Sequence, residues 1–109
     1  MPRLTSALLV SALIRRVQAA GGFAAVVRRG DEIAGSVVVE CLDRNVPTML
    51  LERGSDGDGQ SLWRRVATGA EGDHEQRLAR MIRSDPDLWI VELNIAHAER
   101  FADEILTGD

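Results

Sequence analysis

Apolar residues recur every three or four positions over the first twenty residues of the chain. They are Leu8, Leu9, Ala12, Leu13, Val17 and Ala20. This spacing is typical of a helix that buries one face. Thr5 or Ser6 can cap its first turn, and Gly21 can adopt the left-handed conformation that ends a helix. The pattern predicts an N-terminal helix packed against a core.

Four short runs rich in β-branched or alternating apolar residues follow and predict four strands. They cover residues 23–27, 35–42, 48–53 and 62–67. Residues Arg29 to Ile33 can close a hairpin between the first two strands, with Gly30 supplying a positive φ. A turn at 43–47 and a Gly-rich loop at 54–59 connect the others. Strands joined by such short loops are expected to be antiparallel neighbours.

The second half of the chain predicts a helix, a strand and a final helix. Asp73 and Gln76 have the spacing of a capping box, and Pro86 ends the helix that they begin. Its buried stripe is formed by Leu78, Met81 and Ile82. Residues 87–93 are apolar on both faces, which places this strand inside the sheet. Asn94 can cap a last helix, although a short final strand remains an alternative.

The elements therefore follow the order α-β-β-β-β-α-β-α. This order predicts an α+β fold: a mostly antiparallel sheet of about five strands with helices packed chiefly on one face. A chain of 109 residues is large enough for one hydrophobic core but not for two. We expect residues 1–109 to form a single domain.

Two blocks of the sequence carry a family resemblance. The first comprises residues 4–6, 15–26 and 28–31, and the second is residues 85–92. Both are similar to a family of short bacterial proteins known only as a domain of unknown function. The resemblance covers nearly the whole chain and is loose between Val46 and Gln60. It implies no activity, cofactor or catalytic residue.

The charges argue against a nucleic-acid partner. The chain has 13 basic residues against 17 acids, a net charge of −4, and every basic residue is Arg. No basic run is longer than two residues, whereas duplex-binding proteins concentrate basic residues on one face. We expect no nucleic acid to bind.

The single cysteine and the N-terminal apolar run predict a cytoplasmic protein. Cys41 cannot form an internal disulfide, and its apolar neighbours favour a buried thiol in a reducing compartment. The apolar run from Leu4 to Ile14 is too short to span a bilayer, and Arg15-Arg16 follows it without a cleavage site. We expect no membrane association.

No motif for a metal or a cofactor is complete. The loop at 56–59 has the spacing of a calcium loop, but Ser61 and Ala67 stand where that loop needs Gly and Glu. The soft or imidazole ligands Cys41, His74 and His97 are far apart in sequence. Because the chain has no Lys, a phosphate-binding loop with its lysine is excluded. We expect no metal, no cofactor and no catalytic residue.

Two classes of function remain. Glu40, Asp43 and Glu52 could hold a metal ion in a nuclease-like hydrolase, although the lysine of such enzymes is missing. The preferred hypothesis is a small non-enzymatic domain that acts through contact with an unidentified protein partner.

Its candidate interaction patch consists of Arg28, Arg29, Trp63, Arg64 and Arg65. Arginine and aromatic side chains are enriched at protein interfaces. The alternative is that these arginines form ordinary solvated ion pairs. Either way, the activity itself is unknown.

The sequence also predicts a homodimer. No charge interrupts residues 23–27 or 35–39, so one edge of the sheet lacks the charges that usually prevent strand pairing. Two copies related by a two-fold axis can pair such edges without forming a fibre. Trp63 or Trp89 would then lie at the seam. The alternative is that a terminal helix covers the edge.

Overall fold

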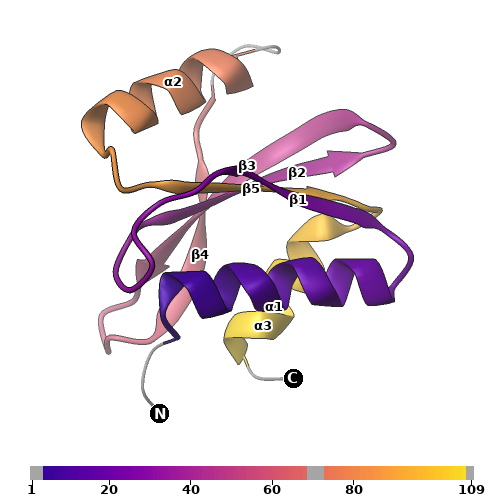
Figure 1. The fold of residues 1–109 in the computed structure, drawn as a ribbon, viewed down its shortest axis with the longest axis horizontal. Helices are drawn as coiled ribbons and strands as arrows, with labels where there is room; N and C mark the ends of the chain where they lie inside the picture. The colour runs from indigo at the N-terminus through magenta and orange to yellow at the C-terminus, as the bar shows by residue number, and fades with distance from the viewer. Residues whose placement is uncertain (1–3, 69–72, 108–109) are drawn as a thin grey trace.

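The computed structural model describes residues 4–68 and 73–107, which form a five-stranded sheet and three helices (Figure 1). In chain order the elements are α1 (Ser6–Ala19), β1 (Phe23–Arg28), β2 (Val37–Asp43), β3 (Val46–Ser55), β4 (Ser61–Val66), α2 (His74–Ser84), β5 (Trp89–Asn94) and α3 (Ala98–Thr107). None of these helices has the length and apolar character that crossing a bilayer requires. The predicted order of elements is confirmed, and the last segment is a helix.

The sheet has the strand order β1-β5-β2-β3-β4. The pairs β1–β5, β2–β3 and β3–β4 are antiparallel, and β2–β5 is parallel. The α+β fold with a mostly antiparallel sheet is therefore confirmed, with one parallel pair that makes the sheet mixed. As predicted, β5 lies inside the sheet.

The predicted hairpin between the first two strands is wrong, because β5 lies between β1 and β2. The intervening loop closes a local turn, in which Gly35 N–H donates to Asp31 O at 3.3 Å, and it binds the start of β5: Asp31 N–H donates to Asp87 O at 3.0 Å, and Trp89 N–H donates to Ser36 O at 2.8 Å. A Cβ on Gly30 would lie closer than 3.0 Å to Asp87 O. Gly30 is thus required for this close approach, and its φ is not positive.

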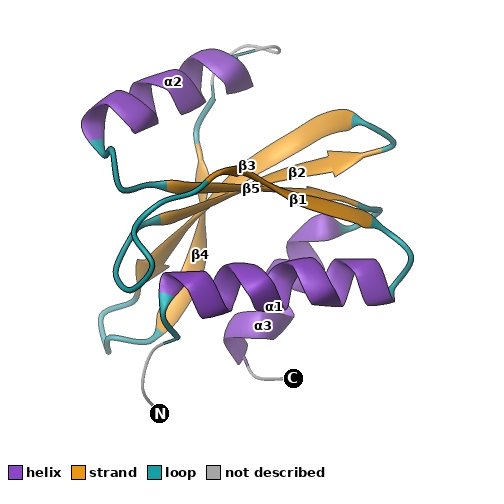
Figure 2. Cartoon of the chain, viewed as in Figure 1, coloured by secondary structure: helices purple, strands orange, loops and turns teal. Residues whose placement is uncertain are grey.

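Helices cover both faces of the sheet, two on one face and one on the other (Figure 2). The α1/α3 face holds the larger core, in which Leu9, Leu13 and Val17 of α1 are fully buried. Their partners on the sheet include Val37, Val39, Cys41, Val91 and Leu93. On the α2 face, a smaller cluster joins Met81 to Val38, Leu50, Leu88 and Ile90. The prediction that helices pack chiefly on one face is confirmed.

The helix ends match the predictions only in part. Thr5 Oγ1 accepts a hydrogen bond from Leu8 N–H at 3.4 Å, and Gly21 has a φ of +87° after α1. The capping box of α2 is wrong, since Asp73 makes no side-chain cap hydrogen bond. The cap predicted at Asn94 is also wrong: Asn94 ends β5, and its Nδ2 donates to Asn45 Oδ1 at 2.7 Å.

Candidate functional site

The structure does not bring the predicted interaction patch together. Arg28 and Arg29 lie at the end of β1, whereas Trp63, Arg64 and Arg65 lie on β4, at the opposite edge of the sheet. Arg28 donates to Pro86 O at 3.0 Å, and Arg64 donates to Ser55 O at 3.1 Å. The two arginine pairs therefore serve separate edges and cannot contact one partner surface as a single cluster.

Both tryptophans are held inside the domain. Trp63 is half-buried, and its Nε1 donates to Ala102 O of α3 at 2.8 Å. Trp89 is only 2% exposed and donates to Asp31 O at 2.6 Å. Because both indole rings have intramolecular partners, the expectation of a tryptophan at a dimer seam is not supported by their positions.

The three acids of the hydrolase hypothesis also separate. Glu40 pairs with Leu50, and Glu52 pairs with Val38, so both carboxylates are on the α2 face of the sheet, diagonal to each other. The register shifts between Cys41 and Leu42, and Asp43 is exposed at the end of β2. Within residues 4–68 and 73–107, no three His, Cys, Asp or Glu side chains are placed to hold a metal ion.

Sequence reasoning missed the acid that does lie beside Glu40. Glu92 of β5 is its direct neighbour across the parallel β2–β5 pair. Burial of the Glu40 carboxyl raises its pKa, the like charges of Glu92 and Glu75 raise it further, and His74 lowers it. The sequence did contain a signal for this acid: apart from Asp87 at its start, the strand predicted over 87–93 has Glu92 as its single charged residue.

Cys41 is chemically inert in this environment. The residue is buried, and burial, with the nearby carboxylates of Glu99 and Glu40, raises the pKa of its thiol to about 12. The thiolate is the reactive form, so the protonated group cannot act as a nucleophile at neutral pH. The interpretation of Cys41 as a small buried hydrophobe is confirmed.

The β1 edge, defined as strand Phe23–Arg28 with its unpaired side, is the most apolar exposed strand. β1 has β5 as its single strand neighbour. Phe23, Val26 and Val27 are 59%, 41% and 57% exposed. Because an edge strand with exposed apolar residues and few charges is a ready template for pairing with another strand, the β1 edge is the strongest candidate functional surface.

Comparisons with known proteins give the family. A family model described as a protein of unknown function, DUF1491, matches residues 4–103. The chain belongs to the DUF1491 family. No curated protein matches it.

Solved structures of DUF1491 proteins have the same fold. A crystal structure from Caulobacter crescentus is 38% identical, with a TM-score of 0.80 over 91% of this chain and 94% of that one. An NMR structure of a DUF1491 protein from the same organism is 37% identical, with a TM-score of 0.78 over 93% and 94%. A solution structure from A. tumefaciens is 36% identical, with a TM-score of 0.74 over 88% and 89%.

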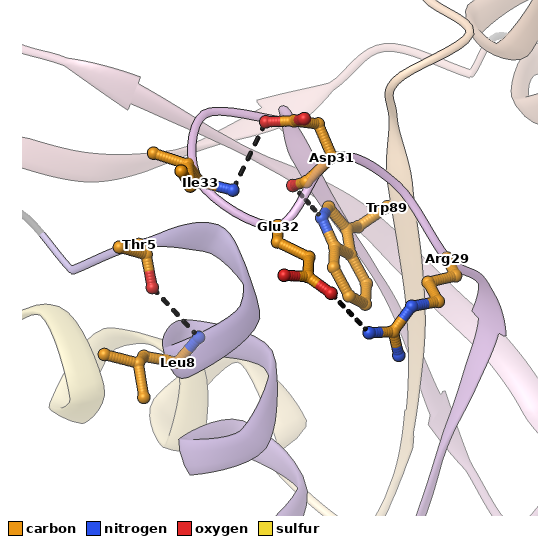
Figure 3. A network of polar contacts seen from close by, with 7 residues as sticks. All are labelled: Thr5, Leu8, Arg29, Asp31, Glu32, Ile33 and Trp89. Atoms are coloured by element: carbon orange, nitrogen blue, oxygen red, sulfur yellow. Dashed lines mark hydrogen bonds and ion pairs between the residues drawn. The ribbon is translucent and has the colours of Figure 1, made fainter.

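The two sequence blocks that carry the family resemblance meet in the structure, where the loop after β1 contacts the start of β5 (Figure 3). The Arg29 guanidinium lies 5.3 Å from the centre of the Trp89 ring and pairs with Glu32 at 3.1 Å. Asp31 Oδ2 accepts hydrogen bonds from the backbone N–H groups of Ile33 and Ala34. These contacts join the loop that follows β1 to the start of β5.

Proposed function

We propose that this DUF1491 protein is a non-enzymatic interaction domain of the bacterial cytoplasm that forms a symmetric homodimer through the β1 edge. The observation that carries this proposal is the exposure of Phe23, Val26 and Val27 on an edge strand. Backbone N–H and C=O groups on the outer side of such a strand lack strand partners. A second copy of the strand satisfies them and covers the apolar side chains.

Antiparallel pairing of β1 with its own copy is chemically consistent. With Ala25 on the two-fold axis, Phe23 of each copy lies opposite Val27 of the other. Arg28 then lies opposite Gly22, so no like charges meet. The register shift between Val26 and Arg28 disturbs the strand at one end, and bulges of this kind weaken edge pairing. The resulting ladder is short, which favours a dimer of about micromolar affinity.

The remaining features agree with this proposal. Glu40, Asp43 and Glu52 do not converge on one metal position, which removes the support for the hydrolase hypothesis. The buried thiol of Cys41 needs no oxidising compartment, in keeping with a cytoplasmic protein.

Sedimentation across a concentration series tests the dimer. We expect the mass to rise from the 11.9 kDa of one chain toward twice that value between micromolar and about 1 mM protein. Val27→Lys places a charge in the seam without disturbing the monomer core, because Val27 is 57% exposed. It should weaken the dimer at least about tenfold, since a charge on an edge strand prevents pairing.

Val46→Lys is the matched control. Val46 is 61% exposed but starts β3, away from β1. This variant should dimerise like the wild type. A wild-type mass that stays at one chain throughout the series, or equal weakening by both substitutions, would refute the proposal.

A further inference from the structure

An open pocket of about 350 Å³ lies between α2 and the sheet. Its lining residues come from β3, α2 and the segment before β5: Glu52, Arg77, Arg80, Met81, Ser84, Asp85 and Leu88. Met81 and Leu88 are buried and supply its apolar part. The volume is at the lower end of the range found for small-molecule sites.

Two guanidinium groups line one wall of this pocket. Arg77 and Arg80 are three residues apart on α2, which places them on one side of the helix. Neither forms an ion pair with any residue in the described ranges. The Nε of Arg77 is buried and has no acceptor within those ranges. Buried donors nearly always have an acceptor, but no hydrogen bond at Nε holds the Arg77 side chain in place among the described residues.

A single carboxylate approaches from the sheet side. Glu52 of β3 lines the same pocket, yet no ion pair joins it to Arg77 or Arg80 in the described structure. Arg64 donates to Ser55 O, and Asp85 Oδ1 accepts from Asp87 N–H; these bonds to neutral backbone groups leave both side chains charged. The lining therefore carries two guanidinium groups, Arg77 and Arg80, and two carboxylates, Glu52 and Asp85.

From this arrangement we infer that the pocket binds a small molecule that carries an oxyanion at one end and a hydrogen-bond donor at the other. Guanidinium groups match the geometry of carboxylate and phosphate oxygens, so Arg77 and Arg80 hold the anionic end. Glu52 accepts from an amine or hydroxyl at the other end. This site is independent of the β1 edge and of the proposed dimer.

An NMR titration at constant ionic strength tests the inference. The probes are phosphoethanolamine and β-alanine, which carry an amine with a phosphate or a carboxylate, and inorganic phosphate, acetate and ethanolamine, which carry one group each. We expect saturable shifts of the backbone amides near Arg77, Arg80 and Glu52. Binding should be at least about tenfold tighter for one of the two-group probes than for its single-group fragments. The tighter of the two shows whether the natural anion is a phosphate or a carboxylate.

Two arginine substitutions separate a site from general charge attraction. Arg80→Gln removes an exposed guanidinium from the pocket and should weaken the better two-group probe at least about tenfold. Arg83→Gln removes an equally exposed charge from the last turn of α2 that does not line the pocket, and should leave binding unchanged.

Glu52→Gln tests whether Glu52 binds the amine or hydroxyl of the ligand. It should reduce the preference for the two-group probe over its anionic fragment, while the anionic fragment still binds. The inference is overturned if no probe gives saturable shifts, or if Arg80→Gln and Arg83→Gln weaken binding equally.

Discussion

At one edge of the sheet, β1 exposes Phe23, Val26 and Val27, whereas at the other edge, β4 exposes Arg64 and Arg65. The β4 edge is also fixed from inside, since Trp63 donates a hydrogen bond to α3. Charged side chains on an edge strand oppose pairing with another chain, because pairing would bury them. β4 carries two exposed charges within the strand, whereas β1 carries a single charge at its last residue, Arg28.

This difference determines the kind of assembly that the sheet allows. Two open edges would let copies add at both sides and build a fibre, whereas one open edge allows a closed pair. The arrangement found here, with an apolar β1 and an arginine-rich β4, therefore favours a dimer that stops at two copies. Substitutions at the two edges, and in the sheet between them, test this contrast.

The largest effect is expected at the loop that follows β1. Gly30→Ala should destabilise the protein by about 3 kcal/mol, because the added Cβ would push against the Asp87 carbonyl and lift the loop from β5. Urea unfolding measures the loss. Gly57→Ala is the control: its Cβ meets no atom within 4 Å, so its effect should stay within about 0.5 kcal/mol. Similar values for the two variants would show that the loop does not anchor the strand.

A smaller effect is expected at the β4 edge. Trp63→Phe removes the donor to Ala102 O and should cost about 1 kcal/mol, the usual net value of one hydrogen bond. Hydrogen exchange of the α3 amides should accelerate in this variant, because the bond ties α3 to β4. Unchanged exchange in α3 would mean that the indole contact does not fix this edge.

The middle of the sheet should respond to pH. Burial and Glu92 raise the pKa of Glu40 above 4.5 in the folded state, so the folded protein binds a proton that the unfolded chain has released. This carboxyl therefore destabilises the fold as pH rises above about 4.5, and the loss levels off above the folded pKa. Glu40→Gln should be more stable than wild type at pH 7, with a smaller advantage at pH 4. Thermal melting of both proteins at pH 7 and at pH 4 tests this prediction. If Glu40→Gln were more stable by the same amount at both pH values, the raised pKa of Glu40 would not be the cause.

The smallest effect on the stability of the monomer is expected when a charge is removed from the β4 edge. Arg65→Val replaces an exposed charge on β4 with a β-branched residue, and its effect on stability should stay within about 0.5 kcal/mol. Association should nevertheless extend beyond the dimer at high concentration, because one of the two exposed charges that oppose pairing at β4 is then gone. Light scattering detects the larger species; a mass that stops at two chains would show that Arg65 does not guard the edge.

Local patterns predicted the elements but not their neighbours. The periodicity from Leu8 to Ala20, the glycine at position 21 and the buried character of Cys41 were readable, because each depends on residues close in sequence. The insertion of β5 between β1 and β2 depends on contacts from Asp31 to Asp87 and from Ser36 to Trp89, which no local pattern contains.

The same limit applies to the candidate sites. Glu40 and Glu92 are neighbours only because β2 and β5 run parallel, and the arginines of β1 and β4 are apart only because three strands separate them. Trp89 was named as a residue of the dimer seam, whereas its indole N–H donates to Asp31 O in the loop after β1. The exposed apolar character of residues 23–27 was readable, since it needs only the absence of charge in one strand.

Hydrogen exchange measured at dilute and at concentrated protein compares the two edges in one experiment. If the β1 edge forms the dimer, the outward-facing amides of residues 23–28 should exchange at least about tenfold more slowly in the concentrated sample, while those of residues 61–66 keep their rates. Rates in β1 that do not depend on concentration, or new protection in β4 instead, would contradict the assignment of β1 as the interaction edge.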